Sequence, residues 1–592
     1  MSIEAASDDQ ALSPFLLRLA RTAPFLFMGV LLFGALAWRP TTAPIELETL
    51  ASAWHMHLHD SLVPLRNGIP DPGIPPLLHW LILGGWQVLG VNEWWPRLVP
   101  ALASLATVLL IGATALALWP HRTETPVFAR LLLTGVGAFA IAMTMVEPQT
   151  LAQPFVLGSF HAIGMLWMAR AAAAAPGDAP RRGRLRRWLW AALLWLACGL
   201  SAALAVLAGG WTWALVPLLC GAGALLFDPP PGGTGADRRG LSARIFARIA
   251  ARIVPWLAGA VFATLVALLP AYLWLDANGP AISLLAFGNG WLDPATEASR
   301  GAAWTLLLLP AVLFPWICWK TLWRALTRHL RERLGTGFRL CLAFLAAVIV
   351  AGLASGWQLI GMLPIVCPLS LLGARLLATQ AIKPKDFHAV VPGFLALMVG
   401  LLFFLMNIVP IAHLDAVWRQ LFDTPLPIWL GGIGLLSGLS LLVIGYVLAQ
   451  LSPSHQLSRT LQVAILPVLL MTSLNLEFHG NLRPFFDLTP VAGRLKALQD
   501  AGFSIGVYAD YRGEFDFAGR LAVAPTPLGS RAAAARWAAE HPGGAIVTYF
   551  DGSPLRLPAL PMFRGVARDR WVAIWPTSAV TGADSPVLNG QF

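Results

Sequence analysis

Residues 44–97 read PIELETLASAWHMHLHDSLVPLRNGIPDPGIPPLLHWLILGGWQVLGVNEWWPR, a segment that is polar where most of the chain is apolar. It separates the first two long apolar runs and is far longer than two neighbouring helices need as a connection. It is also rich in His, Trp and Pro and carries paired carboxylates. We therefore expect the chemistry of the protein in this first outer loop, which we place at residues 40–96.

The composition is that of an integral membrane protein. Of the 592 residues, 57% are hydrophobic and only 12% charged, and the mean hydropathy is +0.67. A soluble protein carries about 25% charged residues. Apolar runs long enough to cross a bilayer recur along the chain and predict about 13 spans. We place them near 23–39, 97–119, 127–146, 149–170, 187–205, 208–226, 253–275, 302–321, 338–354, 357–375, 390–410, 427–449 and 459–474. The apolar stretch 76–92 starts with two prolines and has glycines in its middle, which favours a helix in the membrane interface.

The distribution of basic residues predicts the orientation. With residues 1–22 cytoplasmic, the inner loops collect 25 of the 41 Lys and Arg residues, and the outer loops hold five. An odd number of spans then puts the C-terminal tail on the same side as the first loop. The basic linker 226–252 suits anionic lipid headgroups, so we expect membrane lipids and no nucleic acid as partners. The five cysteines lie in predicted spans and form no disulfide framework. The Ala-, Arg- and Leu-rich usage indicates a GC-rich bacterial source. We therefore expect a bacterial inner membrane, with the first loop and the tail in the periplasm.

From about residue 481 the composition changes to that of a small α/β domain. We expect a helix over 491–505, a pair of strands within 506–517, a helix over 531–541 and strands over 544–550 and 570–576. The predicted fold is thus a polytopic α-helical membrane module, residues 23–480, with a C-terminal α/β domain outside the membrane, residues 481–592.

Several short motifs follow one another in the first loop. They are Pro44-Ile45-Glu46, Pro64-Leu65-Arg66-Asn67-Gly68, Gly73-Ile74-Pro75-Pro76, His79-Trp80, and Leu89-Gly90-Val91-Asn92-Glu93 with Arg97. This order resembles the first loop of membrane glycosyltransferases of the GT-C superfamily, in particular the protein O-mannosyltransferases (family 39) and the aminoarabinose transferases that modify lipid A. The tail stretch 511–517, YRGEFDF, is similar to one in bacterial members. The span count and the outer α/β tail also agree with this resemblance.

The chain departs from the family pattern at three places. Ile45 stands where the resemblance implies an Asp acting as catalytic base. Gly73-Ile74 stands where it implies a Glu that helps hold a metal and a Lys that faces the lipid phosphate. Glu48 stands where an Arg is usual. A base, a metal ligand and two phosphate-binding cations are therefore missing from their usual positions.

Transfer from a polyprenyl-phosphate sugar needs a carboxylate base, cations or a metal to offset charge on the departing phosphate, and a site drier than bulk water. Glu46 and Glu48 are the candidate catalytic carboxylates, although Glu46 also suits a solvated helix start. The candidate phosphate ligands are Arg66, Asn67 and Arg300. The alternative interpretation of Arg66 is an ordinary anchor in the membrane interface. Asp71, His79 and Trp80 are candidate acceptor or sugar contacts, Asp71 also being a typical turn residue. Asp293, in the same outer loop 276–301 as Arg300, is a further candidate.

His55 and His59 are four residues apart and share a helix face, which indicates a divalent-metal site that His79 could complete. The other interpretation is a polar face of an interfacial helix that buries Trp54, Met56 and Leu58 on its other side. No cofactor is certain. Asn92 and Glu93 are expected to cap the second span.

Three hypotheses remain. The first is an inverting glycosyltransferase that moves a sugar from a polyprenyl-phosphate donor to a lipid, glycan or protein acceptor on the outer side. The second is a catalytically degenerate GT-C paralogue that acts as a lipid-linked-sugar-binding or partner scaffold. The third is a transporter or flippase, which the scarcity of intramembrane acidic residues disfavours. The donor sugar and the acceptor are not specified by the sequence.

Overall fold

The fold is described from a computed structural model. It describes residues 14–41, 45–71, 74–173, 184–226, 313–329, 335–354, 360–378, 390–422, 434–451, 455–480, 482–550, 560–567 and 570–588, together with positions 259, 261, 264, 265, 268 and 426. The predicted linker 226–252, Gly73, Asp293 and Arg300 lie outside these residues, apart from Leu226 at the end of α9. The same holds for most of the spans predicted at 253–275 and 302–321.

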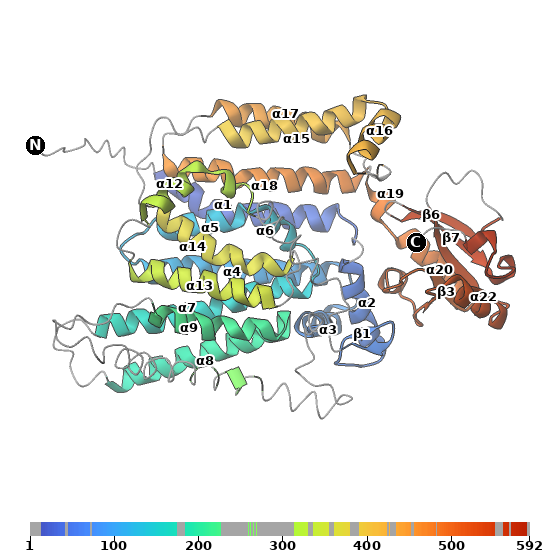
Figure 1. Ribbon diagram of the computed structural model, residues 1–592, viewed down its shortest axis with the longest axis horizontal. Helices are drawn as coiled ribbons and strands as arrows, with labels where there is room; N and C mark the ends of the chain where they lie inside the picture. Colours follow the sequence, from blue (N-terminus) through green and yellow to red (C-terminus); the bar gives the residue numbers. More distant parts are fainter. Residues whose placement is uncertain are drawn as a thin grey trace, which may run out of the picture.

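The membrane module is a stack of long helices that run side by side (Figure 1). Six described helices or helix pairs are long and apolar enough to cross a membrane. They are Pro14–Ala37 (α1), Trp94–Leu118 (α4), Pro148–Ala169 (η1 and most of α7), Leu189–Gly209 (most of α8), Thr336–Ala354 (α13) and Gln456–His479 (α18). The shorter apolar helices include Thr125–Thr134 (α5), Leu215–Leu226 (α9), Val366–Leu377 (α14), Val390–Ile408 (α15) and Leu435–Gln450 (α17). This confirms the predicted helical membrane fold.

The prediction of one continuous span over 127–146 is wrong. The chain leaves α5 at Gly135 and forms a second short helix, Gly137–Ala142 (α6). A Cβ on Gly135 would lie 2.7 Å from the backbone of Ala464 on α18, so close packing against another helix requires glycine here. Similarly, the span predicted over 357–375 begins with the short 3₁₀ helix Ile360–Ile365 (η7) before α14.

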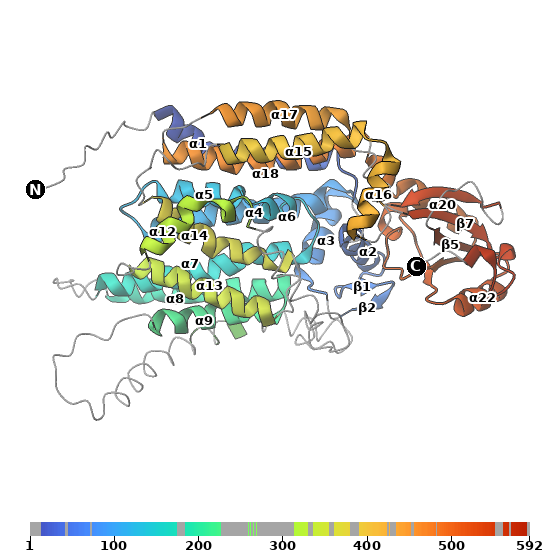
Figure 2. The same ribbon diagram turned by 45° about the horizontal axis from the view of Figure 1, so that its top comes forward.

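Helices α15 and α17 pack through glycines that are seven residues apart on each helix. A Cβ on Gly393, Gly400, Gly438 or Gly445 would lie within 3.0 Å of the backbone of the facing helix. Small residues allow such close approach of helices inside a membrane. Both helices lie at one edge of the stack, beside α18 (Figures 1 and 2).

The first outer loop forms a compact layer between the membrane module and the tail (Figure 2). It contains the helix Ile45–Leu58 (α2), a hairpin of Leu65–Arg66 (β1) with Ile69–Pro70 (β2), and the helix Leu77–Leu89 (α3). The amphipathic interpretation of α2 is wrong. Trp54 and Met56 are buried as expected, but Leu58 is exposed and His55 is buried. Helix α2 is covered on most of its surface because the tail packs against it.

The tail folds into a five-stranded sheet in the order β4-β3-β5-β7-β6. The strands are Ile505–Tyr508 (β3), Thr526–Pro527 (β4), Ala545–Phe550 (β5), Phe563–Ala567 (β6) and Arg570–Pro576 (β7). The first three are parallel, and β7 is antiparallel to both β5 and β6. The main helices are Thr489–Asp500 (α20) and Arg531–Glu540 (α22), so the helix predicted over 491–505 ends earlier, before β3.

The pair of strands predicted within 506–517 is wrong. Only β3 is a strand there, and residues 509–515 form a loop that leads into the short helix Asp516–Gly519 (α21). The loop carries Gly513 with φ of +93°, a backbone conformation that favours glycine. Its side chains Tyr511 and Phe515 are buried, so their apolar alternation reflects contact with α2 and the tail core rather than a sheet.

Candidate functional site

The first turn of α2 places its two carboxylates in different surroundings. Glu46 is fully buried, and its Oε1 accepts hydrogen bonds from Nη2 of Arg39 at 2.7 Å and from the backbone N–H of Val146 at 3.2 Å. Arg39 also donates to the carbonyl of Thr144. Glu46 therefore ties the loop to the membrane module, and the expectation of a solvated helix start is wrong.

Glu48 is the carboxylate of α2 that reaches the surface, with 28% of its side chain exposed. Glu147 lies close enough for the charge of Glu48 to affect its titration. Burial raises the pKa of the Glu147 carboxyl to about 8, the charge of Glu48 raises it further, and a hydrogen bond from the Gln149 N–H opposes both. At neutral pH Glu147 thus keeps its proton near the Glu48 carboxyl, and the two groups are suited to donating and accepting a proton.

Glu147 was missed by the sequence reasoning. It occupies the connection between α6 and the 3₁₀ helix Pro148–Leu151 (η1), where its carbonyl accepts hydrogen bonds from the N–H and the hydroxyl of Thr150. Helix α3 packs against η1, which brings this turn beside the first loop. The signal in the sequence was a single Glu between two apolar runs, on the side predicted to face outward.

The tail contributes a cation to the same region. Nη1 of Arg512 lies 3.8 Å from Oε1 of Glu48, and Nη2 of Arg512 donates to Asp510 at 2.9 Å. The side chain of Arg512 is half exposed. A guanidinium at this position can meet an anionic group that approaches Glu48 from outside.

The tail is joined to α2 by a buried group of polar side chains. Nε2 of His55 and Oδ2 of Asp516 are 2.8 Å apart, and the Tyr511 hydroxyl donates to the other oxygen of the same carboxylate. His55 and Asp516 are almost completely buried. Burial, followed by the charge of Asp516, raises the pKa of Tyr511 well above its ordinary value, so the hydroxyl keeps its proton.

Further contacts extend this junction on both sides. Nε1 of Trp54 donates to the carbonyl of Leu521 at 2.8 Å. The ring of Trp86, on α3, stacks on that of Phe517 with centroids 5.3 Å apart. A Cβ on Gly513 would lie 2.6 Å from Cβ of Ala51, so the tail loop touches α2 directly. The candidate site is therefore built from the first loop, the Glu147 turn and the tail together.

The residues expected to bind phosphate lie on the hairpin β1–β2. Arg66 pairs with Asp71 at 2.7 Å, with half of the Arg66 side chain exposed. Asn67 has φ of +50° and donates from Nδ2 to the carbonyl of Tyr511 at 3.0 Å. The structure thus brings Arg66 and Asp71 together and uses Asn67 as a turn residue that holds the tail.

The two aromatic candidates on α3 point into the protein. His79 is fully buried, and its Nδ1 contacts the carbonyl of Pro75 at 3.2 Å. Burial lowers the pKa of His79 to about 4, so its ring is neutral near pH 7. Trp80 donates from Nε1 to the carbonyl of Leu62 at 2.7 Å. Their roles as acceptor or sugar contacts stay predictions.

The metal hypothesis depends on His55 and His59. Their rings do share one face of α2, stacked with centroids 6.4 Å apart. Nε2 of His55 is engaged by Asp516, however. Within the described ranges no three His, Cys, Asp or Glu side chains gather closely enough to hold a metal ion. The described residues do not fit the metal that the resemblance implies, and we derive no step through one.

The second span begins as the sequence predicted. The side-chain oxygen of Asn92 accepts a hydrogen bond from the backbone N–H of Trp95 at 2.8 Å. Glu93 occupies the N-cap position of α4 without a side-chain hydrogen bond to the helix. Arg97 lies one turn into the helix, and its Nη1 donates to the carbonyls of Ala35 and Arg39 at 3.2 and 2.8 Å.

Comparison with solved structures gives two matches over nearly the whole chain. ArnT from Cupriavidus metallidurans, bound to undecaprenyl phosphate, aligns with a TM-score of 0.63 and 16% identity, over 95% of this chain and 98% of that one. The same protein in the apo state aligns with a TM-score of 0.65 and 17% identity, over 94% and 98%. An oligosaccharyltransferase from Archaeoglobus fulgidus aligns at a TM-score of 0.43, with 11% identity, over 86% and 64%. No protein-family model and no curated protein sequence matches the chain.

These alignments show the fold. The chain has the architecture of ArnT, as the order of motifs in its first loop predicted, with a multi-pass membrane module and a small C-terminal sheet. The identity is too low for activity to follow from the likeness alone.

Proposed function

We propose that the protein is an inverting glycosyltransferase that moves a sugar from a polyprenyl-phosphate donor to a lipid, glycan or protein acceptor. The reaction takes place on the periplasmic side of a bacterial inner membrane. The observation that carries the proposal is the Glu48–Glu147 carboxyl pair, in a chain with the fold of a structure that binds undecaprenyl phosphate.

In the proposed reaction the acceptor oxygen attacks the anomeric carbon on the side opposite the phosphate. The bond between that carbon and the phosphate oxygen breaks, its electron pair stays on the phosphate, and polyprenyl phosphate leaves. Glu48, which reaches the surface, takes the proton from the acceptor oxygen. A single displacement of this kind inverts the configuration at the anomeric carbon.

Glu147 plays a different part because its pKa lies near 8. At neutral pH it keeps a proton and donates a hydrogen bond to a sugar or acceptor oxygen. Two nearby carboxyls, one of which has a raised pKa, can thereby divide the accepting and donating roles. Arg512 supplies positive charge from the tail, where it offsets charge on the phosphate as the bond breaks.

The degenerate-scaffold hypothesis is the second candidate, and one observation favours it. Of the two positions that are acidic in the family, only Glu46 is acidic here. It is buried and accepts hydrogen bonds from Arg39 and from the backbone N–H of Val146. A chain in which this was the only usable carboxylate would bind a lipid-linked sugar without turning it over.

The experiment is the release of polyprenyl phosphate from a panel of polyprenyl-phosphate sugars by the purified protein. Glu48→Gln should lower kcat by at least about a hundredfold, as expected for loss of a general base. Asp500→Asn, at an exposed i,i+4 pair on α20, is the control and should leave turnover unchanged. Binding of donors by the wild type without any turnover would refute the transferase proposal and support the scaffold.

A further inference from the structure

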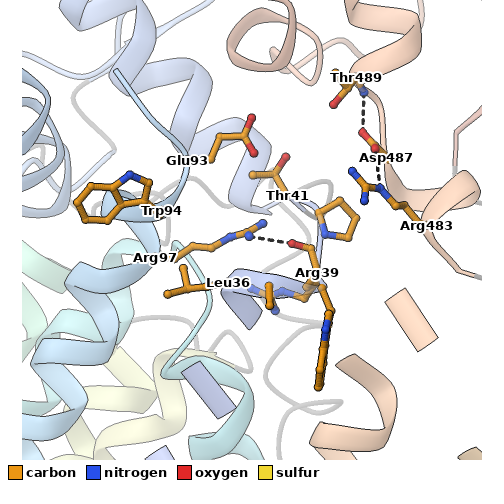
Figure 3. Close-up of a pocket in the computed structure, with 12 residues that line it drawn as sticks. Leu36, Arg39, Thr41, Glu93, Trp94, Arg97, Arg483, Asp487 and Thr489 are labelled. Carbon is orange, nitrogen blue, oxygen red and sulfur yellow. Dashed lines mark hydrogen bonds and ion pairs between the residues drawn. The ribbon is translucent and has the colours of Figure 1, made fainter. Parts of the chain in front are cut away.

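A polar cavity of about 250 Å³ lies beside the junction between the membrane module and the tail, apart from the Glu48–Glu147 pair. The end of α1, the start of α4 and the segment from the short helix Arg483–Phe486 (α19) to α20 line it. In Figure 3 the guanidinium of Arg97 is at its centre, with Arg483 and Asp487 across from it. We call this the arginine cavity, after the lining residues Arg39, Arg97 and Arg483.

Two of its three arginines are buried with unused donors. Arg97 is only 3% exposed, and its Nε and Nη2 meet no acceptor among the described residues. Nε of Arg39 also meets no acceptor among the described residues, whereas its Nη2 donates to Glu46 and to the carbonyl of Thr144. Buried charged donors without acceptors are unfavourable. Three such donor nitrogens, on two arginines that line one cavity, indicate a ligand that brings several anionic oxygens.

The charge of the cavity indicates a monoanion. Its lining holds three arginines and two carboxylates, Glu93 and Asp487, and Arg39 is paired with the buried Glu46, so the charges are balanced. Asp487 already accepts from Arg483 at 3.2 Å and from the N–H of Thr489 at 3.0 Å. Because the charges are already balanced, the one negative charge of a phosphodiester disturbs the cavity less than the two of a phosphomonoester.

The surroundings of the cavity indicate a lipid. Leu36 lines the cavity. From Leu36 toward the N-terminus of α1, one face of the helix carries an exposed apolar stripe of Phe33, Val30 and Leu26. Trp94, which also lines the cavity, is 45% exposed at the start of α4, the level at which tryptophans anchor in membrane interfaces. An acyl chain along this stripe would place a headgroup at the arginines.

We propose that the arginine cavity binds the phosphodiester headgroup of an anionic glycerophospholipid, with the acyl chains along α1. The bound lipid holds the outer ends of α1 and α4 against the α19–α20 segment of the tail. The site is separate from the proposed transfer reaction and does not depend on it.

The test is the binding of phosphatidylglycerol to delipidated full-length protein, titrated and counted by native mass spectrometry. Arg97→Lys should weaken binding about tenfold, the loss of roughly one charge-assisted hydrogen bond. Arg483→Ala should weaken it about threefold, because Arg483 is exposed and already pairs with Asp487. Arg419→Ala is a matched control because Arg419 is equally exposed and also pairs with an aspartate four residues away. It should bind as the wild type does.

Four outcomes would overturn the proposal. In the first, Arg483→Ala binds phosphatidylglycerol like the wild type, a result that stands even if Arg97→Lys fails to fold. In the second, inorganic phosphate displaces the lipid at equal concentration, which makes the ligand a free anion. In the third, phosphatidylethanolamine binds equally well, which removes the requirement for net negative charge. In the fourth, only undecaprenyl phosphate binds in a way that depends on Arg483, which assigns the cavity to a polyprenyl lipid.

Discussion

Replacing Glu147 by glutamine should change how the stability of the protein depends on pH. In the folded chain burial raises the pKa of Glu147 from 4.5 to about 8. Below pH 4.5 the carboxyl is protonated in both the folded and the unfolded chain and has no effect. Between pH 4.5 and 8 the unfolded chain releases the proton and the folded chain retains it, so stability falls as the pH rises. Above pH 8 both chains have released the proton, and the stability falls no further on account of Glu147. Glu147→Gln keeps the shape of the side chain but removes this titration.

The size of the effect follows from the width of this window. Each pH unit between the two pKa values costs about 1.4 kcal/mol of stability. Partial exposure of the side chain reduces the total, and we expect roughly 2–4 kcal/mol over the whole window. The wild type should therefore lose stability relative to Glu147→Gln as the pH rises from 5 to 8.

The assay is thermal unfolding of both proteins in the same detergent, followed by tryptophan fluorescence at pH values from 5 to 9. All other side chains are the same in both proteins, so the difference between the two curves isolates Glu147. Glu48→Gln is the control, in which the fall with pH should persist in smaller form because burial, the larger cause, remains. Superimposable wild-type and Glu147→Gln profiles would refute a desolvated carboxyl at this position.

Three other substitutions test the junction and the buried carboxylates. Asp516→Asn removes the charge beside His55 and should lower the free energy of unfolding by about 3–5 kcal/mol. The control is Asp510→Asn, at an exposed ion pair, which should lower it by at most about 1 kcal/mol. Equal melting temperatures of the two variants would contradict the buried pair. Gly513→Ala should cost about 1–3 kcal/mol and make the tail more sensitive to limited proteolysis, because its φ is +93° and the added methyl would overlap α2. Glu46→Gln should lower the yield and melting temperature by leaving a buried arginine unbalanced, and kcat of the surviving protein should not change.

The membrane helices could be predicted because apolar composition alone requires them. The segment expected at 338–354 is the helix Thr336–Ala354, and the one expected at 187–205 lies within Arg184–Gly209. In a bilayer every backbone group must find its partner within the helix, so hydropathy and length decide these elements. The break at Gly135 depends on the approach of α18, a contact more than 300 residues away in sequence, and no local pattern records it.

The candidate site could be predicted only in part, for the same reason. The spacing of His55 and His59 correctly indicated one helix face, yet the partner of His55 is Asp516, 461 residues further along the chain. The stretch from Tyr511 to Phe517 alternates like a strand, but its side chains are directed into α2 and the core of the tail. Sequence periodicity identifies which residues are buried and does not identify what covers them.

The position of Glu147 bears on the choice between transferase and scaffold. A carboxyl whose pKa is raised to about 8 lowers the stability of the chain at neutral pH, and an apolar or amide side chain would remove that cost. A protein that only bound a lipid-linked sugar would gain nothing from such a group, whereas an enzyme needs a titratable carboxyl near its working pH. Glu147 lies beside Glu48, on the side of α2 where Arg512 of the tail also arrives. This favours a reaction that uses Glu48 and Glu147, while the acidic residue at the family's usual place, Glu46, holds the loop in position.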